Sequence, residues 1–197
     1  PESSLEFAQN VQYDSAKGHM GKRTALYDFR SNNEMWVMIG CGLGGTSLIN
    51  ANVSLPADPR ILDAFPPEIK QNSQLLSHAY QLTREWLQPN TLPDDITLAK
   101  TKGMQRQSET LSNLQSKWYK TPINVAFEEK STKSGVQMHP CKLCGNCVTG
   151  CNYGAKGTTL TNYLPDAHNW GAEIYCQVAV DYITSFLIND NEQGYEL

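Results

Sequence analysis

The sequence predicts a mixed α/β fold, in which helices and short strands alternate along 197 residues. A short apolar run leads into a glycine-rich segment, as a strand leads into a tight loop. Two segments in the middle of the chain read as helices, and apolar alternation typical of strands returns near the end. With 40% hydrophobic residues, the chain is long enough to build one globular core.

The first elements surround the glycine-rich segment. Residues 27–30 alternate between apolar and polar side chains, and residues 35–39 form a short apolar run, so we expect a strand in each. Residues 46–53 carry small side chains and read as a short helix or turn. The prolines between 56 and 67 break up the chain that follows.

The middle of the chain is predicted to be mainly helical. Apolar residues between 68 and 87 recur at helical spacing, which predicts one amphipathic helix ended by Pro89. After a connector, residues 98–118 read as a second and more polar helix. Residues 123–127 are apolar and favour a strand.

The last third predicts one helix and a hairpin. Residues 158–169 fit a helix that Pro165 should interrupt. Residues 174–180 and 182–188 each predict a strand, and the turn residues at 189–194 predict that the second of these enters a hairpin.

Charge and hydropathy argue against a nucleic-acid partner and against a transmembrane helix. The net charge is −4, and there is no basic stripe that could neutralise phosphates, so no nucleic-acid partner is expected. No apolar stretch approaches the roughly 18 residues that a transmembrane helix needs.

The glycine-rich segment predicts a close approach between the backbone and a ligand. Glycines at 40, 42, 44 and 45 leave one short piece of backbone without Cβ atoms, and Thr46, Ser47 and Asn50 then offer hydrogen bonds. Gly40, Gly42 and Gly45 also fit G-x-G-x-x-G, a pattern that is weak without a preceding strand and a later acidic residue. The alternative is a glycine-rich turn between two packed elements.

Two runs resemble one family. The run GLGGTSLINANV at residues 42–53 resembles the second flavin-contacting segment of the glucose-methanol-choline (GMC) oxidoreductases, in the branch that contains cholesterol oxidase. The run GCNYGAKGTT at residues 150–159, with the sequence up to residue 174, is similar to a cysteine-bearing subgroup of that family. The resemblance covers about residues 20–60 and 136–183.

The resemblance implies FAD as the cofactor and a chain that is part of a Rossmann-like FAD/NAD(P)-binding domain. Residues 1–60 and 136–197 would belong to FAD binding, and residues 61–135 would be an inserted helical region on the substrate side. Asn50 would hydrogen-bond the flavin, Ala51 would lie at the reactive edge of the ring, and Val180 would lie against the adenine. The residues expected at the cofactor are Gly40, Gly42, Gly44, Gly45, Thr46, Ser47, Asn50, Ala51, Asn52, Val53 and Val180.

The family also implies a reaction. An alcohol or sterol would be oxidised at its CH–OH group by hydride transfer to the flavin, with oxygen or a redox partner as the electron acceptor. The family's first FAD fingerprint and its catalytic histidine have no match here, so we expect an internal fragment that binds FAD poorly alone. None of the four histidines matches the catalytic motif, and no catalytic residue is assigned.

A cysteine quartet is the second chemical feature. Cys141, Cys144, Cys147 and Cys151 have the spacing C-x2-C-x2-C-x3-C, which is that of bacterial [4Fe–4S] ligands. Asn152 stands where proline usually follows the fourth cysteine. The same cysteines also fit disulfides or small buried residues, and zinc fits less well because its ligands more often come as two separated pairs. An iron–sulfur electron-transfer module and a disulfide-knotted structural domain are therefore the alternative functions.

The other cysteines and histidines receive structural interpretations. Cys41 is expected to be a packed small residue, and Cys176 is expected in the core of a strand. His139, just before the quartet, is a weaker candidate for a ligand, and His19 has no recognisable partner in the sequence.

Overall fold

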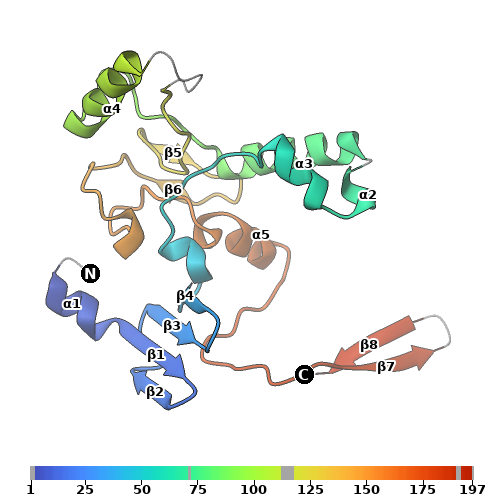
Figure 1. The fold of residues 1–197 in the computed structure, drawn as a ribbon. Helices are drawn as coiled ribbons and strands as arrows, with labels where there is room; N and C mark the ends of the chain where they lie inside the picture. The colour runs from blue at the N-terminus through green and yellow to red at the C-terminus, as the bar shows by residue number, and fades with distance from the viewer. Residues whose placement is uncertain (1–2, 71, 112–117, 190–191, 197) are drawn as a thin grey trace.

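A computed structural model describes residues 3–70, 72–111, 118–189 and 192–196. It has a mixed α/β fold, which confirms the predicted class (Figure 1). A four-stranded sheet lies near the N-terminus, helices occupy the middle of the chain, and a separate hairpin lies near the C-terminus.

The N-terminal sheet carries the glycine-rich segment at the end of its last strand. After helix α1 (Ser4–Gln9) come β1 (Val11–Ser15), β2 (Gly18–Gly21), β3 (Tyr27–Ser31) and β4 (Trp36–Gly40). The order is β2-β1-β3-β4, with β1 parallel to β3 and the other pairs antiparallel. Strands β3 and β4 confirm the two predicted strands.

Strands β1 and β2 were not predicted, because polar residues face each other across them. Their register places Asp14 opposite His19 and Gln12 opposite Gly21, so the apolar alternation that identifies a strand is missing. His19, for which the sequence shows no recognisable partner, contacts Asp14 and the Gly21 carbonyl in the structure.

The predicted helix over residues 68–87 is two helices, α2 (Pro67–Lys70) and α3 (Ser73–Leu87). Asn72 begins α3, since its side-chain oxygen accepts a hydrogen bond from the Leu75 amide at 2.9 Å, which is the geometry of an N-cap. The helix ends at Leu87, and the residue that caps it, Gln88, has a left-handed conformation just before Pro89.

Helix α4 (Ala99–Thr110) is shorter than the predicted span of 98–118. Residues 112–117 of that prediction lie outside the described residues. None of the helices in the described parts of the chain is long and apolar enough to span a membrane.

The segment predicted as a strand at residues 123–127 forms only isolated bridges. Ile123 pairs with Val53 and with Asn90, and Val125 pairs with Lys156. This segment therefore lies between the chain that follows the glycines and the chain that follows the cysteines. Buried apolar side chains gather here, at Ile49, Val125, Ala126, Met138 and Ala155.

The remaining short elements are β5 (Lys130–Ser131), β6 (Gln137–Met138) and α5 (Tyr163–Asn169). The prediction that Pro165 interrupts the helix is wrong, since the break falls at Asn162. Pro165 is the third residue of α5, in the first turn, where a missing N–H costs no helical hydrogen bond. Trp86 of α3 contacts Tyr163 of α5, with ring centroids 5.4 Å apart.

The strand predicted at residues 174–180 is also wrong. No residue of this segment is paired, and its apolar side chains at 174, 175, 178 and 180 are exposed. Alternation alone does not make a strand without a neighbour to pair with. Cys176 is consequently exposed rather than in the core.

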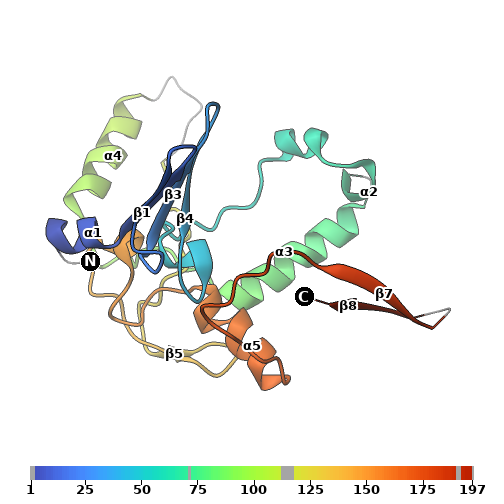
Figure 2. The ribbon, with the colours of Figure 1, turned by 90° about the horizontal axis from the view of Figure 1, so that it is seen from below.

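The hairpin prediction is confirmed. Strand β7 (Thr184–Asn189) pairs antiparallel with β8 (Glu192–Glu196), and both views show the hairpin standing away from the N-terminal sheet (Figures 1 and 2). The turn residues 190–191 lie outside the described residues.

Candidate functional site

The glycine-rich segment folds into a loop closed on itself. The Gly40 amide donates to Thr46 Oγ1 at 3.2 Å, and the Gly45 amide donates to the Gly42 carbonyl at 2.9 Å. A Cβ at Gly40 would lie 2.5 Å from the Gly45 carbonyl oxygen, so no other residue fits there without a shift. Gly40 is therefore needed for the closed conformation of the loop.

Gly45 has a different environment. Its φ is +56°, and a Cβ built on it would meet nothing within 4 Å. Gly44 also has a positive φ, but a Cβ there would touch the Leu48 side chain at 3.1 Å. Of the loop glycines that the sequence analysis singled out, Gly45 is the one whose missing side chain leaves open space beside the backbone.

The hydroxyls in the loop hold it to the chain beyond the cysteines. Ser47 Oγ donates to the Gly44 carbonyl at 2.6 Å and accepts from the Thr159 amide at 3.1 Å. Thr159 Oγ1 donates to the same Gly44 carbonyl at 3.0 Å. Both motifs found in the sequence are thus parts of one structure.

The segment after the loop alternates between exposed residues and one buried residue. Asn50, Ala51 and Val53 are exposed, and the Ala51 N–H makes no hydrogen bond to any described residue. Asn52 is only 1% exposed and has φ +62°, and within the described chain both polar atoms of its side chain lack a partner. Buried polar atoms without a partner are uncommon, and a bound water or ligand is one way to satisfy them.

Lys156 is the polar residue at the centre of this arrangement, and the sequence analysis did not single it out. Its side chain is buried, and its ammonium group donates three hydrogen bonds to backbone carbonyls. The acceptors are Leu48 and Asn50, both at 2.8 Å, and Cys147 at 2.7 Å. Burial lowers the pKa of Lys156, while the thiols of Cys147 and Cys151 act in the opposite direction.

All four cysteines of the quartet are free thiols and line one small hollow, together with Val125, Tyr153, Ala155 and Lys156. The hollow offers a volume of about 20 Å³, roughly the space of one water molecule. Within the described residues, no group of three His, Cys, Asp or Glu side chains is placed to hold a metal ion.

The four cysteine side chains of the quartet differ in their exposure to solvent. Cys144 is exposed, whereas burial and then the neighbouring Cys141 thiol raise the pKa of Cys147. Since the thiolate is the reactive form, we expect iodoacetamide to modify Cys144 and Cys176 well before Cys147 in the metal-free protein.

Mass spectrometry of timed alkylation of the complete polypeptide measures this order. Equal rates for Cys147 and Cys176 would contradict the described burial. Protection of Cys144 together with the rest of the quartet, while Cys176 still reacts, would indicate a bound cluster.

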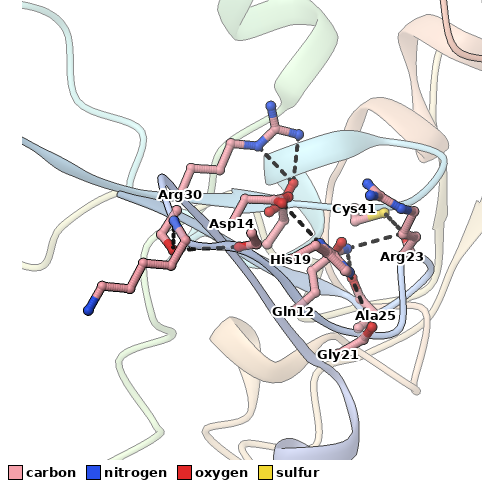
Figure 3. Close-up of polar contacts among 12 residues, drawn as sticks. Gln12, Asp14, His19, Gly21, Arg23, Ala25, Arg30 and Cys41 are labelled. Atoms are coloured by element: carbon pink, nitrogen blue, oxygen red, sulfur yellow. Dashed lines mark hydrogen bonds and ion pairs between the residues drawn. The ribbon is translucent and has the colours of Figure 1, made fainter. Parts of the chain in front are cut away.

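A second group of polar contacts lies on the N-terminal sheet and at Cys41, which follows β4 (Figure 3). His19 Nδ1 lies 3.0 Å from an Asp14 carboxylate oxygen, and its Nε2 lies 3.1 Å from the Gly21 carbonyl. Cys41 Sγ donates to the Arg23 carbonyl at 3.4 Å and is half-buried, in agreement with its interpretation as a packed residue. These contacts occupy both ring nitrogens of His19, which favours a structural role.

The other candidates lie apart from the loop. His139 Nδ1 pairs with the exposed carboxylate of Glu129 at 3.0 Å. Val180 is exposed, in the unpaired segment that leads to the hairpin. The structure thus brings together the candidates from Gly40 to Val53, and it leaves Val180 exposed in another part of the chain.

Comparison with known proteins gives a consistent result. A family model described as GMC oxidoreductase matches residues 15–193. A curated cholesterol oxidase of Mycobacterium tuberculosis is 29% identical over 190 residues, which cover 87% of this chain and 32% of that protein. A cholesterol oxidase of Acinetobacter baumannii is 36% identical over 64 residues, covering 32% of this chain and 12% of that protein. No solved structure matches the chain significantly. The chain spans about a third of the length of the mycobacterial relative.

Proposed function

Because this chain belongs to the GMC oxidoreductase family, we propose that it forms part of an FAD-dependent enzyme that oxidises the CH–OH group of an alcohol or sterol. The names of its relatives make a sterol the first substrate to test. The observation that carries the proposal is the exposed Ala51, whose N–H has no partner among the described residues and which follows a glycine with open space beside it.

The residues present fit the flat ring of a flavin. Gly45 offers no side chain that would keep a ring away, and the Ala51 N–H is a donor without a described partner. Asn52 adds two buried side-chain atoms whose hydrogen bonds are unmade. Hydrogen-bond donors that are already in place stabilise the negative charge that a flavin ring gains when it is reduced.

When bound, FAD supplies the hydride acceptor for the oxidation. This chain would bind and orient the ring through the segment from Gly45 to Val53. The base that removes the hydroxyl proton is not assigned to any residue here. The region of α2, α3 and α4, at residues 61–135, is proposed to lie on the substrate side, because it links the two segments that build the loop.

The experiment uses the complete polypeptide that contains this chain. After purification we expect the visible absorbance bands of oxidised flavin, and we expect their loss when a sterol alcohol is added without oxygen. A short aliphatic alcohol and the corresponding ketone serve as comparisons. The proposal would be contradicted if the protein binds no flavin, or if no alcohol reduces the bound flavin.

The cysteine quartet is proposed as an iron–sulfur site inside this oxidoreductase. The supporting observation is that Cys141, Cys144, Cys147 and Cys151 are free and line the same hollow. The reading as an independent ferredoxin-type module is not favoured, since the family match at residues 15–193 includes the quartet. Iron and acid-labile sulfide analysis after anaerobic purification tests this, and the absence of both removes the cluster.

A further inference from the structure

We propose that the buried ammonium group of Lys156 is a fixed positive charge that raises the reduction potential of the iron–sulfur site proposed at the cysteine quartet. The inference rests on the proposed function, because it gives one residue of this chain a role toward that site. It starts from the position of Lys156, from its three hydrogen bonds, and from a second lysine that shares its position but not its burial.

The first step is the place of Lys156 in the hollow of the quartet. All four cysteines and Lys156 line this hollow, whose volume is only about 20 Å³. The Lys156 ammonium group also donates to the carbonyl of Cys147, one of the four candidate ligands, at 2.7 Å. The lysine therefore lies directly beside the thiols that would hold the metal.

The second step is that this lysine carries its charge. Lys156 is only 4% exposed, and its three acceptors are the carbonyls of Leu48, Asn50 and Cys147. A carbonyl oxygen can only accept, so three such bonds require three N–H groups, and only the protonated form of a lysine has three. The same three bonds hold the ammonium group in place and keep it from turning out to solvent.

The third step is the effect of such a charge on thiolate ligands. Cysteines bind a metal as thiolates, so a quartet of them gathers negative charge, and an added electron increases it further. Because a buried charge is screened less by water and salt than an exposed one, the ammonium group should stabilise this negative charge. Stabilising the reduced state raises the reduction potential, which in iron–sulfur sites depends on net charge and solvent exposure.

The hollow contains a natural comparison for this effect. Lys142 also lines it and directly follows Cys141, but Lys142 is exposed. Water and salt screen an exposed charge, so Lys142 should contribute little to the potential. Of the two lysines that line the hollow in the described structure, Lys156 is the buried one.

The test measures the midpoint potential of the iron–sulfur site in the complete polypeptide, by redox titration followed with electron paramagnetic resonance. It compares K156Q and K156R with K142Q and Y27F. Glutamine keeps two donors without the charge, whereas arginine keeps the charge in a different shape. Y27F removes an uncharged tether of the cysteine loop, since the Tyr27 hydroxyl donates to the Val148 carbonyl at 2.9 Å.

For K156Q we expect the equilibrium constant for reduction to fall about tenfold, which is about 59 mV toward more negative potential for a one-electron couple. K156R should keep most of the potential of the unchanged protein, and K142Q and Y27F should leave it unaltered. Iron and sulfide content and thermal unfolding show whether each variant retains the site and the fold.

Equal potentials of K156Q and the unchanged protein would overturn the inference while the proposed function stands. A shift in K156R or Y27F as large as that in K156Q would also overturn it, because loosening of the loop and not loss of charge would then be the cause. An unchanged protein without iron and sulfide would instead refute the proposed iron–sulfur site itself.

A second measurement does not depend on the folding of a variant. If a buried charge sets the potential of the unchanged protein, the midpoint potential should change little as the salt concentration is raised. A potential that falls steeply with added salt would show that exposed charges set it, and would contradict the inference.

Discussion

Replacing Gly40 with alanine is expected to destabilise the protein by about 3 kcal/mol, at the upper end of the range for overpacked sites. The new Cβ would lie 2.5 Å from the Gly45 carbonyl oxygen and 2.9 Å from the Thr46 Cα. Both are backbone atoms, so neither can move away by changing a rotamer. The loop would have to open at the point where β4 ends.

Urea denaturation of the apo form of the complete polypeptide measures this loss, with thermal unfolding as a second probe. Gly103→Ala is the matched control, since Gly103 lies within α4 and an added Cβ there meets nothing within 4 Å. The control should be stabilised by up to about 1 kcal/mol, because alanine favours helix over glycine. Equal stability of G40A and the unchanged protein would show that the loop does not close as described.

Replacing Lys156 with methionine is expected to cost about 3 kcal/mol of stability. The change removes the hydrogen-bond donor of three backbone carbonyls, those of Leu48, Asn50 and Cys147. Each buried hydrogen bond that is left unmade costs about 1–3 kcal/mol of stability, and less where water can replace the donor. Methionine retains most of the apolar stem, so lost packing contributes little.

Lys130→Met is the control for removing a partly buried lysine. Burial lowers the pKa of Lys130 as it does that of Lys156, but within the described residues its ammonium group makes one longer hydrogen bond to a backbone carbonyl, to Gln88 at 3.3 Å. We expect K130M to cost less than about 1 kcal/mol in the same urea titration. A loss as large as that of K156M would mean that the three carbonyls near the glycine loop are not what makes Lys156 important.

Local patterns predicted the elements that local forces determine. The apolar run before Gly40 and the alternation around Phe29 identified β4 and β3, and the turn residues after Ile188 identified the hairpin. The predictions failed where tertiary contacts determine whether a segment forms a strand. Strands β1 and β2 pair through polar residues, and residues 174–180 alternate without a neighbouring strand.

The candidate site shows the same division. Residues from Gly40 to Val53 were identified because glycines and small polar residues are unusual in such density. Lys156 was missed because a lysine in a sequence is normally a solvated surface charge. Its role depends on carbonyls 106 and 108 positions earlier in the chain, a separation that no local pattern reveals.

The hydrogen bond between Tyr27 and Val148 spans 121 positions, and those from Lys156 to Leu48 and Asn50 span more than 100. A ribosome releases the chain from its N-terminal end, so the glycine loop emerges long before the lysine that fixes its carbonyls. Closing so long a stretch of polypeptide is slow in comparison with forming a helix or a hairpin. The backbone proposed to receive the flavin would thus be among the last parts of this chain to mature during biosynthesis.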